Sequence, residues 1–133
     1  MKERPEISVR QVMREEVTEV DGSIDVMQAM LIMKRVKATA LIVKKRNEHD
    51  EYGMVLLSDI ATQVIAKDRA PERVNVFEIM TKPVIAVRPE MNIRYCSRLF
   101  EKFGMTHAPV LENDQVIGII SYHALVLGGL DLD

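Results

Sequence analysis

The fold is decided by the stretch Gly53-Met54-Val55-Leu56-Leu57-Ser58-Asp59-Ile60, because a diverged copy of it, Gly118-Ile119-Ile120-Ser121-Tyr122-His123-Ala124-Leu125, lies near the end of the sequence. Each copy is typical of a glycine, a short apolar strand, a small polar turn and the start of a helix. A strand that runs into a helix presents backbone N–H groups that favour an anion, and Asp59 falls at the N-cap or in the first turn. Two such junctions in 133 residues predict a duplicated unit.

The duplication extends through the whole chain. Thr39 recurs as Thr106, 67 positions later, whereas Gly53 and Gly118 are 65 positions apart. The offset changes inside a polar turn, where insertions cost little. Each half therefore predicts the same order of elements: a helical turn, a short strand, an amphipathic helix, a two-stranded hairpin and a final helix.

Periodicity and turn residues place these elements. Apolar stripes at helical spacing run through Val26, Ala29, Met30 and Met33, and through Ile93, Cys96, Phe100 and Phe103. The expected elements are helical turns at 8–14 and 75–80, strands at 17–20, 40–43, 53–57, 84–87, 108–111 and 117–120, hairpin turns at 45–51 and 112–115, and final helices at 58–67 and 121–128.

Composition argues against several classes of function. The chain is 47% hydrophobic and 29% charged, as in ordinary globular proteins, and its net charge of −2 provides no basic face for nucleic acid. No apolar run reaches the ~18 residues needed to cross a bilayer, and no signal peptide is recognised, so we expect a cytoplasmic protein.

Catalytic and metal-binding motifs are also not expected. The single cysteine, Cys96, lies in an apolar helical pattern and is interpreted as a buried, inert thiol. The three histidines are not at metal-ligand spacing. The sequence has no nucleophile elbow, Walker loop or dinucleotide fingerprint, so we expect neither a metal site nor an enzyme.

The order of the motifs resembles the tandem cystathionine-β-synthase (CBS) domain pair, or Bateman module. The resemblance rests on Met80-Thr81-Lys82-Pro83-Val84-Ile85-Ala86-Val87, on His107-Ala108-Pro109-Val110-Leu111 and on the two glycine-led stretches, and it covers about residues 8–128. It implies an α/β fold of two βαββα CBS repeats packed sheet to sheet with pseudo-twofold symmetry. We expect repeat 1 with its lead-in at 1–67, a linker at 68–74 and repeat 2 at 75–133. Nothing beyond the pair remains, so we expect a stand-alone module, and the family implies a homodimeric disc.

The resemblance also implies a ligand. CBS pairs commonly bind adenosine compounds (AMP, ADP, ATP or S-adenosylmethionine) in clefts between the repeats. An Asp holds the ribose hydroxyls, and a Ser or Thr three residues earlier lies beside the ribose and phosphate. Asp59 matches the carboxylate, but Leu56 stands in the hydroxyl position, with Ser58 as a substitute. In the second repeat Ser121 matches the hydroxyl, but Ala124 replaces the carboxylate. We therefore expect two unequal sites, the Asp59 site being the stronger.

The other candidate contacts follow from the family pattern, in which basic residues before the middle strand meet phosphates and the first strand encloses the adenine. In the first repeat they are Thr18, Lys37, Thr39 and Ala40; in the second they are Val84, Ile85, Ala86, Thr106, His107, Ala108, Pro109 and His123, with Lys82 near its entrance. The implied mechanism is a conformational shift, as in energy sensing, which a partner protein reads.

Each assignment has an alternative. Asp59 and Ser121 are also explained as helix caps, Lys37 as a solvated lysine and His107 as a polar strand-edge residue. The alternative functions are a ligand-free CBS pair that acts only in oligomerisation or protein interaction, and a small enzyme acting on a nucleotide. The incomplete motif in both repeats favours the ligand-free pair.

Overall fold

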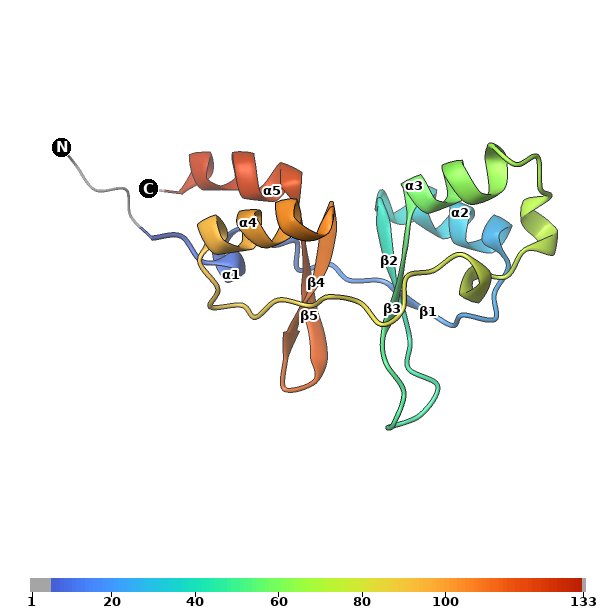
Figure 1. Cartoon of the computed structure of the whole chain (residues 1–133), viewed down its shortest axis with the longest axis horizontal. Helices are drawn as coiled ribbons and strands as arrows, with labels where there is room; N and C mark the ends of the chain where they lie inside the picture. The colour runs from blue at the N-terminus through green and yellow to red at the C-terminus, as the bar shows by residue number, and fades with distance from the viewer. Residues whose placement is uncertain (1–5, 133) are drawn as a thin grey trace. The chain divides into compact units, whose positions relative to one another are not determined.

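A computed structural model of the chain describes residues 6–132, except the side chain of Asp131. The described residues form two compact units (Figure 1). The continuous unit is Thr18–Val84, and the split unit joins residues 6–17 to residues 85–132. Residues 1–5 and 133, which end the expected repeats, lie outside the described residues.

The continuous unit is built around a three-stranded sheet in the order β1-β2-β3. The first two strands are parallel and the last two antiparallel, with Ala40 opposite Leu56 and Val43 opposite Gly53. Its elements are β1 (Glu19–Val20), α2 (Val26–Val36), β2 (Ala40–Val43), β3 (Gly53–Leu56), α3 (Leu57–Ile60), the π-helix η1 (Ala61–Ile65) and the 3-10 helices η2 (Pro71–Arg73) and η3 (Val76–Glu78). Figure 1 shows the long β2–β3 hairpin extending from the end of the sheet opposite α3.

Helix α2 begins at a capping box and packs its apolar face on the sheet. The Asp25 carboxylate accepts a hydrogen bond from the Gln28 backbone N–H (2.8 Å), and the Gln28 side chain accepts one from the Asp25 N–H (3.0 Å), which completes a capping box. The helix buries Val26, Ala29 and Met33 against the sheet, so the predicted apolar stripe is confirmed.

The split unit contains an antiparallel pair of strands covered by helices (Figure 1). Its elements are α1 (Val9–Val12), α4 (Ile93–Phe103), β4 (His107–Glu112), β5 (Gln115–Ser121), α5 (Tyr122–Leu127) and the 3-10 helix η4 (Gly128–Asp131). The turn between the strands is Asn113 and Asp114, with φ of 51° and 62°. Two consecutive positive φ values are those of a type I′ turn, which suits a two-residue hairpin.

The second predicted stripe is only partly correct. Cys96 and Phe100 on α4 are fully buried in the core of the split unit, and Ile93 packs against that core. Phe103, however, is 52% exposed. It is the last residue of α4 before Gly104 turns the chain into the left-handed region, and its ring lies 5.6 Å from the Lys102 ammonium.

Three predicted elements differ from those observed. The strand expected at 84–87 is reduced to one bridge, Val87 to Val110, because prolines on both sides, Pro83 and Pro89, provide no N–H for a ladder. The strand expected at 17–20 extends only over Glu19–Val20. The helix expected at 58–67 is α-helical only to Ile60 and continues as a π-helix.

Each compact unit includes a short segment that the sequence repeats assign to the other half. Val9 of α1 is buried in the core of the split unit, and Val76 of η3 is buried in the core of the continuous unit. The attachments are equivalent: Arg14 and Ile119 exchange two backbone hydrogen bonds of 2.9 Å, and Thr81 and Met54 exchange two of 2.8 and 2.9 Å. Arg14 and Thr81 are 67 positions apart, and Met54 and Ile119 are 65 positions apart, as the repeat in the sequence predicts.

The predicted linker 68–74 also ends inside a core. Val74 is 2% exposed within the core of the continuous unit, and its carbonyl accepts a hydrogen bond from Val26 N–H at 2.8 Å. A single apolar residue after seven polar or small ones gave no periodic signal, so the sequence did not reveal this contact.

Candidate functional site

Seven predicted ligand residues meet at one end of the sheet of the continuous unit. This group, called the Asp59 site, consists of Thr18, Lys37, Thr39, Ala40, Leu56, Ser58 and Asp59. Strand pairing brings Ala40 opposite Leu56, and the carbonyl of Thr18 accepts a hydrogen bond from Ile42 N–H at 3.0 Å. The fold therefore gathers residues that are up to 41 positions apart, from 18 to 59.

The Asp59 carboxylate lies in the first turn of α3. It occupies the third helical position, is partly buried, and its Oδ2 accepts a hydrogen bond from the Leu56 N–H at 2.8 Å. Leu56, at the N-cap, has no side-chain oxygen with which to cap the helix in return. The predicted position of Asp59 in the first turn is thus confirmed, and so is its contribution to capping.

The equivalent junction in the split unit has a capping hydroxyl at the N-cap but no carboxylate at the third helical position. Ser121 is the N-cap of α5, and its hydroxyl accepts a hydrogen bond from Ala124 N–H at 3.4 Å, so its predicted capping role is confirmed. Ala124 occupies the same third helical position as Asp59 but carries no carboxylate. A capping box needs both halves, and each repeat retains one of them.

Some of the backbone N–H groups predicted to favour an anion donate hydrogen bonds within the protein. Leu57 N–H donates to the Thr39 carbonyl at 2.9 Å, and Leu56 N–H donates to Asp59. In the split unit Tyr122 N–H donates to the Thr106 carbonyl at 3.3 Å. These amides are therefore committed to the protein itself, and whether the later amides of either junction bind an anion stays a prediction.

Lys37 is held in an unusual backbone conformation. It is the C-cap of α2 with φ of 57°, in the left-handed region, and its side chain is exposed. Its repeat counterpart, Gly104, has the same conformation with φ of 64°. Glycine adopts this region without strain, whereas another residue costs about 1 kcal/mol or more. The lysine is thus retained two residues before Thr39 at some cost to stability.

Eight predicted residues of the second repeat meet at the corresponding end of the β4–β5 pair. His107 lies opposite Ser121, and its Nδ1 is within hydrogen-bond distance, 2.9 Å, of the Thr106 hydroxyl. This group, called the Ser121 site, consists of Ile85, Ala86, Thr106, His107, Ala108, Pro109, Ser121 and His123. Ala108 and Pro109 are buried, so their side chains present little surface to a ligand.

Lys82 and Val84 lie outside both groups. Val84 is the last residue of the continuous unit. Lys82 Nζ lies 2.8 Å from each carboxylate oxygen of Asp50 in the β2–β3 hairpin, at the end of the sheet opposite the Asp59 site. Asp50 also accepts hydrogen bonds from the backbone N–H (2.8 Å) and Nε (3.1 Å) of Arg46.

Asp50 was not predicted as a special residue. The Lys82 ammonium, followed by the N–H groups of Arg46, holds its pKa well below the ordinary 3.8. Its carboxylate is only 8% exposed and remains ionised at neutral pH. The sequence offered no signal for this pair, because the two residues are 32 positions apart in segments without periodicity.

No other chemistry is evident in the described part of the chain. Residues 6–132 contain no group of three or more His, Cys, Asp or Glu side chains arranged to hold a metal ion. Cys96 is buried, and burial raises its pKa to about 11, which agrees with the predicted inert thiol. None of the helices within the described range combines the length and the apolar character needed to cross a bilayer.

The chain matches one family model and several curated proteins. The model of the CBS domain family matches residues 9–66 and 76–128. An uncharacterized protein of Methanopyrus kandleri is 30% identical over 77 residues, which are 56% of this chain and 39% of that protein. A homoserine O-acetyltransferase of Methanosalsum zhilinae is 33% identical over 115 residues, which are 86% of this chain and 22% of that protein. The chain thus spans less than two thirds of the length of the curated relatives it matches.

Solved structures share the fold. A hexameric CBS-CP12 protein from bloom-forming cyanobacteria has a TM-score of 0.88 at 36% identity, over 90% of this chain and 69% of that chain. A protein with CBS domains from Burkholderia ambifaria MC40-6 has a TM-score of 0.83 at 28% identity, over 96% and 97%. The CBS domain pair of protein MJ0100, in complex with 5′-methylthioadenosine and S-adenosyl-L-methionine, has a TM-score of 0.79 at 22% identity, over 95% and 99%.

Proposed function

The chain belongs to the CBS domain family, and from this premise we propose that it is a regulatory module that binds an adenosine compound at the Asp59 site. The candidate compounds are AMP, ADP, ATP and S-adenosylmethionine. The proposal is supported by the MJ0100 domain pair, a structural neighbour that was solved with two adenosine compounds bound. No catalytic step and no catalytic cofactor is proposed.

The observation that carries the proposal is the position of the Asp59 carboxylate. It lies at the same end of the sheet as Thr18, Thr39 and Ser58, and the exposed Lys37 comes two residues before Thr39. A carboxylate accepts two hydrogen bonds from a cis-diol, each worth at most about 1.5–3 kcal/mol because the acceptor is charged. A ribose with both hydroxyls free satisfies this geometry, and Lys37 would meet a phosphate attached to it.

The strained conformation of Lys37 supports a ligand role independently. Residues held in the left-handed region cluster at ligand-binding sites, and Lys37 has a φ of 57°. We therefore expect Lys37→Gly to raise the free energy of unfolding by about 0.5–1 kcal/mol. The same substitution should weaken binding of phosphate-bearing nucleotides and leave binding of S-adenosylmethionine unchanged.

The two sites are expected to differ in affinity. The Ser121 site lacks the carboxylate because Ala124 occupies the position of Asp59. Loss of the diol contacts weakens binding by about one to two powers of ten. Ala124→Asp would restore the carboxylate in the first turn of α5, where a negative charge also suits the helix dipole. We expect this variant to bind a second equivalent of ligand.

Regulation would follow from a population shift. A ligand changes the balance between two arrangements of the chain only to the extent that it binds one of them more tightly. A protein partner that recognises the favoured arrangement would read the signal. We propose a homodimer as the working assembly.

Thermal unfolding with a ligand panel tests the proposal. AMP, ADP, ATP, S-adenosylmethionine and 5′-methylthioadenosine would each be added to the wild type and to Asp59→Asn, which keeps an oxygen for the Leu56 N–H. A ligand at 100 times its dissociation constant stabilises the folded state by about 2.7 kcal/mol, so a binding compound raises the Tm. We expect at least one compound to do so, with a much smaller rise in the variant.

A ligand-free module for association is the alternative function. The incomplete motifs at Leu56 and Ala124 favour it, as do exposed apolar side chains at the end of α5 and in η4: Val126 is 69% exposed and Leu130 is 77% exposed. No rise in Tm with any compound at millimolar concentration, together with a concentration-dependent oligomer in light scattering, would replace the sensor by this alternative.

A further inference from the structure

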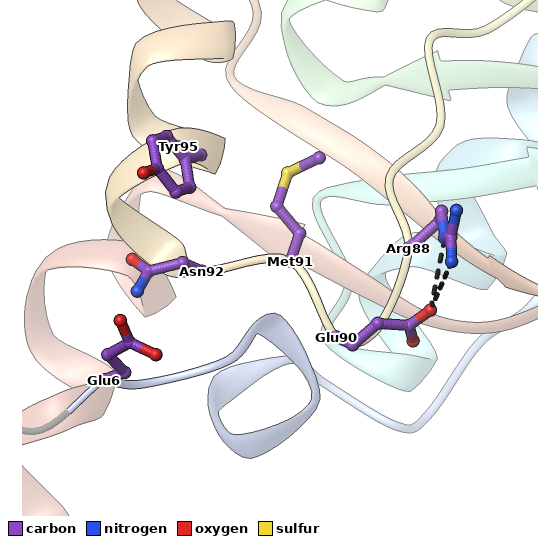
Figure 2. A pocket seen from close by; sticks show the side chains of 6 residues that line it. All are labelled: Glu6, Arg88, Glu90, Met91, Asn92 and Tyr95. Carbon is purple, nitrogen blue, oxygen red and sulfur yellow. Dashed lines mark hydrogen bonds and ion pairs between the residues drawn. The ribbon is translucent and has the colours of Figure 1, made fainter.

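A cavity of about 500 Å³ lies in the split unit, beside the turn that precedes α4 (Figure 2). None of the residues of the Asp59 and Ser121 sites lines it. Its walls are formed by Glu6, Arg88, Glu90, Met91, Asn92 and Tyr95. Figure 2 shows the Glu6 carboxylate and the Asn92 amide at one end, the Arg88–Glu90 pair at the other and Met91 between them.

The frame of the cavity is fixed by backbone hydrogen bonds. The segment after Glu6 runs antiparallel to residues 89–93, with Ser8 opposite Asn92. Val9 N–H donates to the Met91 carbonyl at 2.8 Å, and Ile93 N–H donates to the Ile7 carbonyl at 2.9 Å. These bonds hold Glu6 beside the first turn of α4.

The electrostatics of the cavity are unfavourable for an anion. The first N–H groups of α4 are occupied, since Ile93 donates to Ile7 and Arg94 donates to the Asn92 side chain at 2.8 Å. The Arg88 guanidinium is engaged by Glu90 at 3.0 and 3.2 Å, which also lowers the pKa of that carboxyl. Within residues 6–132, no ion-pair partner lies close to the Glu6 carboxylate. Among the described lining residues, the Glu6 carboxylate is therefore the charged group that is not engaged by a neighbour in the wall.

The rest of the wall suits a methylene chain that ends in a cation. Met91 offers an apolar surface, and Tyr95 is 61% exposed. The guanidinium carbon of Arg98 lies 5.5 Å from the centroid of that ring, so the ring already attracts one cation. Because Arg98 makes that cation contact, the exposed surface of Tyr95 is left to pack against the methylene chain of a ligand.

We propose that this cavity binds an alkylammonium group, with the nitrogen on Glu6 and the methylene chain against Met91 and Tyr95. Charge complementarity selects this class of ligand over anions, and the apolar floor selects it over a small inorganic cation. The group could come from a free polyamine or from a lysine side chain of a partner protein.

Two-dimensional amide NMR tests the proposal. The full chain would be titrated with spermidine, as the free polyamine, and separately with Nα-acetyl-lysine methylamide, as the lysine side chain. We expect shifts concentrated at the amides of residues 6, 88 and 90–95. Tighter binding of one probe identifies the source of the ammonium group, and either result supports the site.

Charge-reversal variants provide the control. Glu6→Lys should raise the dissociation constant about tenfold, because it replaces an attractive charge by a repulsive one. Glu72→Lys, on an exposed residue of η2, makes the same change in net charge and should leave the constant unchanged. The proposal is wrong if the shifts spread over surface carboxylates, if both variants weaken binding equally, or if neither probe causes shifts at tens of millimolar.

Discussion

Replacing Gly118 with alanine should destabilise the split unit, because residues 13 and 14 lie directly over this glycine. A Cβ at position 118 would lie 2.5 Å from Met13 Sδ and 3.0 Å from the Arg14 carbonyl oxygen. The methionine can rotate only by losing contacts with the core of the split unit, against which it packs. The Arg14 carbonyl cannot move without breaking its 2.9 Å bond to Ile119 N–H.

The magnitude follows from two opposing terms. Overpacking a well-filled site costs about 1–3 kcal/mol. Alanine also restricts the unfolded chain, which offsets about 0.4–1 kcal/mol. We therefore expect Gly118→Ala to lower the free energy of unfolding by about 1–2 kcal/mol. Gly53→Ala is the matched control: its Cβ would meet Met80 Sδ at 2.8 Å, Val43 Cβ at 3.2 Å and backbone only at 3.4 Å, so the loss should be smaller, about 1 kcal/mol.

Urea unfolding followed by circular dichroism measures both variants, and a double-mutant cycle locates the cause. Met13→Ala removes the side chain that obstructs the new methyl group, so the double variant should be more stable than the sum of the two losses predicts, by about 1 kcal/mol. Additive losses, or a Gly118→Ala protein as stable as Gly53→Ala, would show that the segment 8–14 does not pack on β5.

The remaining predictions concern single side chains. Asp50→Asn should lower the free energy of unfolding at pH 7. Urea titrations at several pH values should show the wild type losing this advantage over the variant as the pH falls below about 3.8. The reason is that the folded pKa of Asp50 is depressed, so the unfolded chain gains a proton that the folded chain does not; a constant difference would refute this. Cys96 should not react with a thiol reagent at pH 8 in the native state but should react fully in urea, because it is buried with its pKa raised to about 11; rapid native labelling would contradict that burial. Ser121→Ala should cost about 0.5–1 kcal/mol in urea unfolding, because its capping hydrogen bond is long at 3.4 Å; no loss would remove its capping role.

The sequence predicted those features that repeat or that depend on neighbouring residues. The duplication is confirmed by the equivalent bridges of Arg14 to Ile119 and Thr81 to Met54, and the α/β fold of two CBS repeats is confirmed by the family match and the solved structures. The cap at Ser121 depends on local chemistry, and it was also predicted correctly. The role of Asp59 toward a ligand stays a prediction.

Features that depend on distant contacts were not predictable in the same way. The burial of Val9 beside the second repeat depends on where the chain passes between units, which periodicity does not encode. The Asp50–Lys82 pair joins two irregular segments, and the π-helix after Ile60 follows a sequence with ordinary helical preferences. Phe103 satisfied the helical spacing but lay one turn too far along α4 to be covered.

Recognition of a ribose diol by Asp59 is tested most directly by a calorimetric cycle. The dissociation constants of the adenosine compound that raises the Tm most and of its 2′,3′-dideoxy analogue would be measured for the wild type and Asp59→Asn. The wild type should prefer the ribose form by about 10- to 100-fold, and the variant should bind both forms equally weakly. An undiminished preference in Asp59→Asn, or no preference in the wild type, would contradict the account.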